Sequence, residues 1–310
     1  MVRVMSDALD SPSVHVPVLP EEVCSLLLAC DPEVAVDCTL GLAGHARLLL
    51  ERSPRLRLIG LDVDSHNLSA AAERLAPFAG RIQLVKANFA DLREVLTRLQ
   101  VEGAGAILAD LGVSSNQISD PQKGLSFEVD GPLDMRLDEN LTTTAADLVN
   151  GLPEGELADL LYLQSQERLS RKISKRICQV RRQGRINSTV QLARLVAFAV
   201  GQNPDAHRGR IHPATRTFMA LRMAVNREAA SLQRLLAQAP DCLRAGGRIG
   251  VISFHSGEDR LVKDDFRTRS RAGIYELVTK KPVCAGEVES ATNPRSRSAK
   301  LRVAQRESSP

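Results

Sequence analysis

The segment 34–45, VAVDCTLGLAGH, constrains what this chain can fold into more than any other stretch. A short apolar run ends at Asp37, a turn with two glycines follows, and an apolar helical pattern, ARLLLERS, begins directly after it. Glycines let a backbone adopt positive φ and approach a ligand closely, and the next helix offers free N–H groups at its start. Parallel α/β sheets build cofactor cradles from strand, glycine turn and helix in this order. Because many glycine turns only reverse the chain, this segment alone leaves ligand binding open.

A second apolar run, Arg57 to Asp64 (RLIGLDVD), ends in acidic residues. A carboxylate at the tip of a second strand, here Asp62, can accept hydrogen bonds from both ribose hydroxyls of a nucleoside cofactor. The two segments together predict the nucleoside-binding half of a doubly wound sheet. These segments are compatible with either a dinucleotide or S-adenosylmethionine as the cofactor, although the absence of a G-x-G-x-x-G motif counts against NAD.

The alternation of strands and helices continues on both sides of a long interruption. Further strands are predicted at 81–89, 103–110 and 248–256, helices at 65–80 and 91–100, and a closing hairpin at 275–283 and 298–306. The segment 214–247 is typical of one helix, or of two broken at Pro240. Strands alternating with helices predict a parallel sheet with ligands at the strand tips.

For about ninety residues after Gln117 the chain shows only helical patterns, at 144–152, 154–183 and 189–202, and no convincing strand. This predicts an all-helical insertion in the α/β domain. We expect a flexible tail at 1–14, a first part of the α/β domain at 15–118, the insertion at 119–210 and a second part at 211–310.

The composition limits the partners and the cellular compartment that we expect for this protein. The 310 residues carry a formal net charge of +4, which is compatible with nucleic acid, while aromatic residues make up only 3% and Trp is absent. Extensive base-stacking platforms are therefore not expected. The six cysteines form no CxxC and have no zinc spacing, the N-terminus lacks an apolar leader, and no run is long enough for a membrane span. These features predict a cytoplasmic protein with free thiols.

Basic residues concentrate in one stretch. Between Arg168 and Arg185 there are eight basic residues and no acidic one, with apolar residues at helical spacing. A solvated helix face is the simpler interpretation, but the uniform sign favours binding of RNA phosphates. The candidate RNA contacts are Arg168, Arg171, Lys172, Lys175, Arg176, Arg216, Arg295 and Arg297.

Two polar residues at strand tips are candidates for catalysis. Asp110 ends the fourth strand, where a carboxylate could accept a hydrogen bond from an exocyclic amine and make its nitrogen more nucleophilic. The alternatives are that Asp110 caps the turn or holds the cofactor. His255 ends the fifth strand, and a general base, an RNA contact and a plain hydrogen-bonded residue all stay open.

Taken together, these residues resemble the bacterial small-subunit (16S) ribosomal RNA cytosine-N4 methyltransferase family. The resembling segments are HVPVLPEEV, DCTLGLAGH, LDVD, NF, DLGVSSNQI, GLSFEVDGPLDMRLD, HPATRTFMALRMAVN, SFHSGEDR and NPRSRSAKLR. The resemblance implies a class I Rossmann-like methyltransferase sheet with an inserted all-helical domain. It also implies transfer of methyl from S-adenosylmethionine to N4 of a cytidine in the decoding region of small-subunit RNA. The fourth strand lacks the Pro-Pro-aromatic signature of DNA amino-methyltransferases.

The family pattern also assigns site residues. Its cofactor contacts correspond to Ala43, Gly44, His45, Asp62, Phe89, Asp110 and Gln117. No metal is expected. The implied partner is ribosomal RNA or the small ribosomal subunit, and a homodimer stays open.

Three positions depart from the family pattern. Ala43 stands where the family usually has Gly, Ser165-Gln166-Glu167-Arg168 replaces Gly-Glu-Glu-Arg, and Gly257 replaces Leu. These departures keep a second hypothesis open, a weakened or inactive relative that binds ribosomal RNA without methylating it. The third hypothesis is a nicotinamide-dependent oxidoreductase. For Ala43 we predict that the turn accommodates Ala at negative φ and that the enzyme is active.

Overall fold

The computed structural model describes residues 16–203 and 212–308. The predicted tail at 1–14 and the last part of the predicted insertion, 204–210, lie outside the described residues. In the described chain no helix has the length and apolar character needed to cross a membrane.

The strands form one seven-stranded sheet in the order β3-β2-β1-β4-β5-β7-β6. Its strands are β1 (Val34–Asp37), β2 (Arg57–Asp62), β3 (Ile82–Lys86), β4 (Ala104–Asp110), β5 (Leu243–Ser253), β6 (Tyr275–Leu277) and β7 (Lys300–Arg306). Strands β1 to β5 run parallel, whereas β7 pairs antiparallel with both β5 and β6. The predicted α/β sheet and its closing hairpin are confirmed. Strand order reverses between β1 and β4, which is where such sheets bind ligands.

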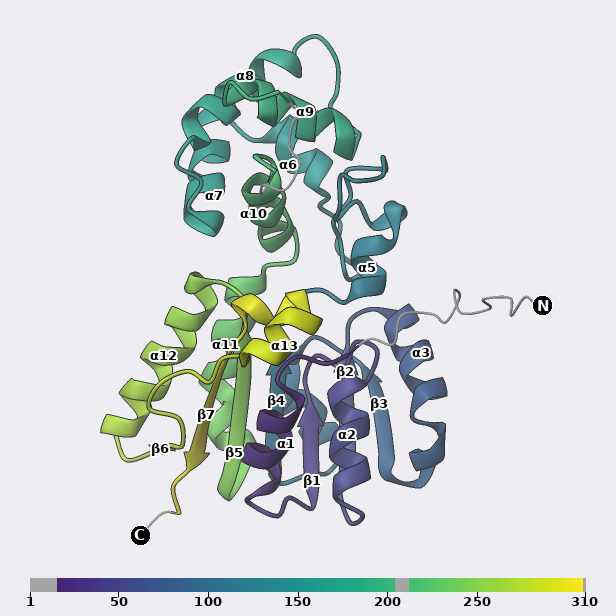
Figure 1. The fold of residues 1–310 in the computed structure, drawn as a ribbon, viewed down its shortest axis with the longest axis vertical. Coiled ribbons are helices and arrows are strands. Elements are labelled where there is room, and N and C mark those ends of the chain that lie inside the picture. The colour runs from purple at the N-terminus through teal and green to yellow at the C-terminus, as the bar shows by residue number, and fades with distance from the viewer. Residues whose placement is uncertain (1–15, 204–211, 309–310) are drawn as a thin grey trace, which may run out of the picture.

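Alternate strand residues enter two separate cores, because side chains of a strand point to opposite faces. Val36, Ile107 and Ala109 face one core, while Ala35 and Leu108 face the other. The first core is covered by α4 (Leu92–Arg98), α11 (Glu228–Cys242) and α12 (Ser256–Arg271), and the second by α1 (Pro20–Leu28), α2 (Gly44–Arg52) and α3 (Ser65–Arg74) (Figure 1). Both faces of the sheet are therefore buried, as a parallel sheet requires.

A second lobe, the helical lobe, stands beyond the carboxyl ends of the parallel strands (Figure 1). Its helices are α6 (Ala145–Gly151), α7 (Glu154–Ser165), α8 (Ser170–Val180), α9 (Thr189–Ala199) and α10 (Thr215–Val225). They enclose a third core that includes Leu161, Ile177, Val196 and Phe218. Two short helices, α5 (Ser115–Ser119) and α13 (Glu287–Thr292), lie between the lobes (Figure 1).

Helix boundaries differ from the sequence prediction at three places. The pattern at 154–183 forms two helices, because Gln166 adopts a left-handed conformation (φ 54°) and ends α7. The 214–247 segment breaks at Arg227 (φ 51°), whereas Pro240 lies inside α11, close to its C-terminal end, and does not divide it. The helix at 65–80 ends at Arg74 and is followed by a 3-10 helix, Ala76–Arg81.

The chain also returns from the helical lobe to the sheet at a different residue than the sequence analysis predicted. We expected the second part of the α/β domain to begin at 211, yet α10 contributes Phe218, Leu221 and Val225 to the core of the helical lobe. The chain leaves that lobe at the break between α10 and α11. Periodicity alone could not locate this point, since both helices are amphipathic.

Candidate active site

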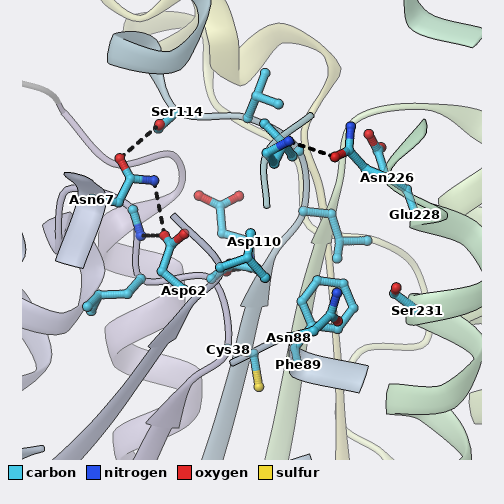
Figure 2. Close-up of a pocket in the computed structure, with 18 of the residues that line it drawn as sticks. Cys38, Asp62, Asn67, Asn88, Phe89, Asp110, Ser114, Asn226, Glu228 and Ser231 are labelled. Atoms are coloured by element: carbon cyan, nitrogen blue, oxygen red, sulfur yellow. Dashed lines mark hydrogen bonds between the residues drawn. The ribbon is translucent and has the colours of Figure 1, made fainter. Parts of the chain in front are cut away.

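A cavity of about 390 Å³ lies at the carboxyl ends of the parallel strands (Figure 2). Its lining combines the strand tips with the junction of α10 and α11. Of the predicted cofactor contacts, the cavity brings together Gly44, His45, Asp62, Phe89, Asp110 and Gln117. Ala43 is not among the residues that line it.

The carboxylate of Asp62 is held by three donors. Its Oδ1 accepts from the backbone N–H of Asp64 (2.8 Å). Its Oδ2 accepts from the N–H of Gly41 (2.9 Å) and from Asn67 Nδ2 (3.1 Å), and Figure 2 shows the bond from Asn67. Burial raises the pKa of Asp62, and these hydrogen bonds act in the opposite direction. A carboxylate offers about four lone-pair positions, so Asp62 has room for about one further donor instead of the two ribose hydroxyls we expected.

The glycine turn that contacts Asp62 includes the departure at Ala43. Ala43 has φ 59° and a fully buried side chain that packs in the core with α2. The expectation of a negative φ is wrong, because α2 begins directly after a left-handed residue. Such a conformation costs a residue with a Cβ about 1–2 kcal/mol, and this Cβ points into the core and not into the cavity.

Gln117 and Phe89 border the cavity in different ways. Gln117 is 5% exposed; its Oε1 accepts from the N–H of Ser114 (3.1 Å), and its Nε2 donates to Asp64 Oδ2 (2.9 Å). The amide of Gln117 therefore fixes the loop between β4 and α5. Phe89 is half-buried just beyond the tip of β3, where Asn88 caps its 3-10 turn.

Asp110 occupies the centre of the cavity (Figure 2). Its backbone N–H donates to Thr39 Oγ1 (2.6 Å), and its Oδ2 lies 3.5 Å from His45 Nε2. Within the described residues, Asp110 Oδ1 and both ring nitrogens of His45 are buried without a hydrogen-bond partner. Buried polar groups are nearly always paired, so this cluster indicates a ligand that supplies the missing partners.

Sequence analysis did not single out Asp37 as part of this cluster. Asp37 is 2% exposed, and burial raises its pKa to about 6, although His45 and the N–H of Thr39 oppose the shift. Asp37 ends β1 in a wholly buried strand, and that pattern alone does not reveal an ionisable group facing His45.

His255 does not line the cavity. Its Nδ1 accepts from the N–H groups of Gly257 (3.2 Å) and Glu258 (3.4 Å), which caps α12, and its Nε2 lies 3.2 Å from Glu258 Oε1. Of the three alternatives for His255, this geometry favours the plain hydrogen-bonded residue. Glu258 itself lines the cavity; burial acts to raise its pKa, but the nearby His255 ring, the Phe254 N–H and the Arg222 charge outweigh burial and lower it.

The predicted RNA contacts fall into two groups. We call the exposed side chains at the start and along the outer side of α8 the α8 basic surface, namely Arg168, Arg171, Lys172, Lys175 and Arg176. Arg171 pairs with Asp159 (2.7 Å), and Arg216 and Arg297 are exposed elsewhere. Arg295 differs, because it lines the cavity and donates to Ser115 Oγ (2.6 Å) and to the carbonyl of Val113. Burial lowers the pKa of Arg295, and the Asp110 carboxylate opposes this effect.

Comparison with known proteins decides the family. A family model described as the MraW methylase family matches residues 12–307. The chain is 50% identical to "Ribosomal RNA small subunit methyltransferase H" of Prochlorococcus marinus (strain MIT 9303), over 98% of this chain and 92% of that one. Proteins of the same name from Synechococcus sp. (strain CC9902) and Methylobacterium sp. (strain 4-46) are 51% and 45% identical, covering 95% and 96% of this chain and 98% and 92% of their own.

The chain belongs to the MraW methylase family. The resemblance inferred from the sequence motifs is thereby confirmed, the protein is a methyltransferase, and S-adenosylmethionine is its methyl donor. The cavity of this MraW methylase fits that donor, since Asp62 retains an acceptor position and buried polar atoms of His45 and Asp110 lack partners in the described chain. None of the departures at Ala43, Gln166 and Gly257 is among the described residues that line the cavity.

Proposed function

We propose that this protein methylates the N4 amine of a cytidine in the decoding region of small-subunit ribosomal RNA. The names of its relatives support the RNA substrate. The amine is proposed as the methyl acceptor because Asp110 Oδ1 is buried in the cavity and has no hydrogen-bond partner among the described residues. From this position a carboxylate can accept a hydrogen bond from an N–H. The implied setting is the cytoplasm, where the small subunit is assembled.

For methyl transfer from S-adenosylmethionine to an amine, the main task of the protein is to position the two reactants. When bound, S-adenosylmethionine supplies a methyl group on a positively charged sulfur, which is already a good electrophile. The lone pair of an aromatic amine is delocalised into its ring, and a hydrogen bond from its N–H to Asp110 Oδ1 returns electron density to the nitrogen. His45, 3.5 Å from the other Asp110 oxygen, and Thr39, which accepts from the Asp110 N–H, hold this carboxylate in place.

We further propose that the cofactor lies against Gly44, His45, Asp62, Phe89 and Gln117, with Asp110 between cofactor and base. RNA phosphates would contact the α8 basic surface together with Arg216 and Arg297. The exposed, uniformly positive side chains of α8 support this assignment. Arg295, held against the 113–115 turn, would act at the cavity mouth and not on the outer surface.

A nucleoside analysis tests the proposal. Small-subunit RNA is isolated from cells with and without this gene and digested to nucleosides for mass spectrometry. We expect N4-methylcytidine to disappear with the gene and to return when the purified protein and S-adenosylmethionine are added to that RNA. An unchanged nucleoside profile would instead support the second hypothesis, a relative that binds ribosomal RNA without methylating it.

A further inference from the structure

The lining of the cavity contains two aromatic side chains among the described residues, Phe89 and Phe254. This is notable in a chain in which aromatic residues make up only 3%. Phe89 follows β3 and packs against the core under α4 and α11, whereas Phe254 follows β5 and packs against the core under α1 and α2. The two rings therefore lie on opposite faces of the sheet. Because the family pattern assigns Phe89 to the methyl donor, Phe254 is the lining ring left for the acceptor base.

The main chain around Phe254 is firmly held next to Asp110. Asp110 pairs with Ile252 in the β4–β5 ladder, and the N–H of Leu111 donates to the Ile252 carbonyl (3.0 Å). The N–H of Phe254 donates to Oε2 of the buried Glu258 (3.0 Å). Because Glu258 also faces the His255 ring that caps α12, the position of Phe254 is set by both the strand and the following helix.

The Phe254 ring lies beside Gly112, a residue without a side chain in the turn that follows Asp110. Gly112 has φ +112°, and a Cβ on it would lie 3.8 Å from Phe254 Cδ2. The ring edge thus borders the bare main chain of Gly112, two residues after Asp110. Phe254 is half-buried, with contacts to the core on the α1–α2 side of the sheet and a surface on the cavity.

A base whose exocyclic amine is to reach Asp110 must leave its stack in the RNA, and the lost stacking has to be replaced inside the enzyme. We propose that Phe254 is the surface on which the acceptor cytosine stacks, and that it positions the N4 amine at Asp110. This inference rests on the proposed function. It assigns Phe254 to the RNA base and Phe89 to the methyl donor, so the two rings should be separable by experiment.

The test compares Phe254→Leu and Phe254→Tyr with the wild type. Removing one base–aromatic contact is expected to lower kcat/KM for small-subunit RNA about 5- to 150-fold in Phe254→Leu, and Tyr should restore most of it. The affinity for S-adenosylmethionine, measured by calorimetric titration without RNA, should stay within about twofold of the wild type. Retained donor binding also shows that the variant is folded.

The matched control is Phe89→Leu, for which we expect the opposite pattern, a weaker donor affinity. Wild-type kcat/KM in Phe254→Leu would overturn the inference, as would a loss of donor affinity as large as the loss of kcat/KM. If Phe254→Leu does not fold, a Phe254→Tyr enzyme with the activity of a non-aromatic variant such as Phe254→Met would equally overturn it. Failure of the proposed function looks different, because the wild-type protein would then form no N4-methylcytidine.

Discussion

The two lobes of this protein carry polar groups of opposite kinds. In the sheet lobe they are buried and converge on one cavity, where Asp62 accepts three hydrogen bonds and one oxygen of Asp110 has no partner among the described residues. In the helical lobe the α8 basic surface is exposed and points away from the core formed by Ile173 and Ile177. Buried groups act over a few ångströms and suit chemistry, whereas exposed cations act through the long-range field that attracts a polyanion. The comparison teaches that methyl transfer and RNA affinity should be separable by mutation.

The largest expected effect is on chemistry in the sheet lobe. Asp110→Ala removes the acceptor for the amine N–H and should lower kcat about 10²- to 10⁴-fold. Binding of RNA should be nearly unchanged, because the α8 basic surface is untouched. Single-turnover kinetics with saturating RNA and S-adenosylmethionine measures the step. A rate within threefold of the wild type would remove Asp110 from the reaction.

Charge reversal in the helical lobe is the converse experiment. Replacing Arg171, Lys172, Lys175 and Arg176 by Glu should reduce the slope of log K against log salt concentration by roughly three units, if all four contact phosphates. Arg171 already pairs with Asp159, so its share should be the smallest. Filter binding of small-subunit RNA over a salt series gives the slope, and donor affinity serves as the control. An unchanged slope would show that this surface is only solvated.

Removal of Asp62, the proposed ribose acceptor, tests the donor site within the sheet lobe. Asp62→Ala should weaken S-adenosylmethionine by roughly 1.5–3 kcal/mol. It also leaves the N–H groups of Gly41 and Asp64 and the Asn67 amide without their acceptor, so the melting temperature should fall as well. Calorimetric titration and thermal unfolding measure the two effects. Wild-type donor affinity in the folded variant would exclude Asp62 from the site.

Buried charge in the sheet lobe should also be visible as a pH dependence of stability. The pKa of Asp37 is about 6 in the fold and 3.8 in the reference state, so its contribution is most favourable below pH 3.8 and is lost as the pH rises through 6. The ionised carboxylate then costs about 3 kcal/mol. Asp37→Asn should therefore raise the free energy of unfolding at pH 8, with a smaller gain at pH 4. Chemical denaturation at both pH values is the measurement, and an equal gain at both would contradict the assignment.

The smallest effect concerns Ala43. Ala43→Gly relieves about 1–2 kcal/mol of left-handed backbone strain at φ 59°. It also removes a methyl group buried in the core, worth about 0.8 kcal/mol, and adds about 0.5–1 kcal/mol of unfolded-chain entropy, so the free energy of unfolding should change by less than about 1 kcal/mol. Donor affinity and methylation should change less than about tenfold, which is 1.4 kcal/mol. Denaturant unfolding and calorimetric titration test the two statements. A rise from no turnover to robust turnover would show that the natural turn is defective.

Several features of this protein follow from the sequence by itself. The period of apolar residues specified the parallel strands, the covering helices and the helical interruption, because strand and helix periods are local properties of the chain. The motifs around Gly44, Asp62 and Asp110 placed the ligand site at the strand tips, and a parallel sheet then has to bring those tips together. Eight basic residues without an acid between Arg168 and Arg185 likewise predicted an exposed positive helix.

Other features were decided only by the tertiary structure. Gln166 and Arg227 end helices in left-handed conformations that packing imposes, although neither residue type prefers them. Arg295 lies in the cavity because its guanidinium reaches Val113 and Ser115, far away in the chain, and His255 is drawn into the cap of α12. Whether a polar atom is satisfied depends on every neighbour that the fold brings near. The sequence pattern therefore could not show that one oxygen of Asp110 lacks a partner among the described residues, that three donors hold Asp62, or that the ring of Phe254 lies beside Gly112.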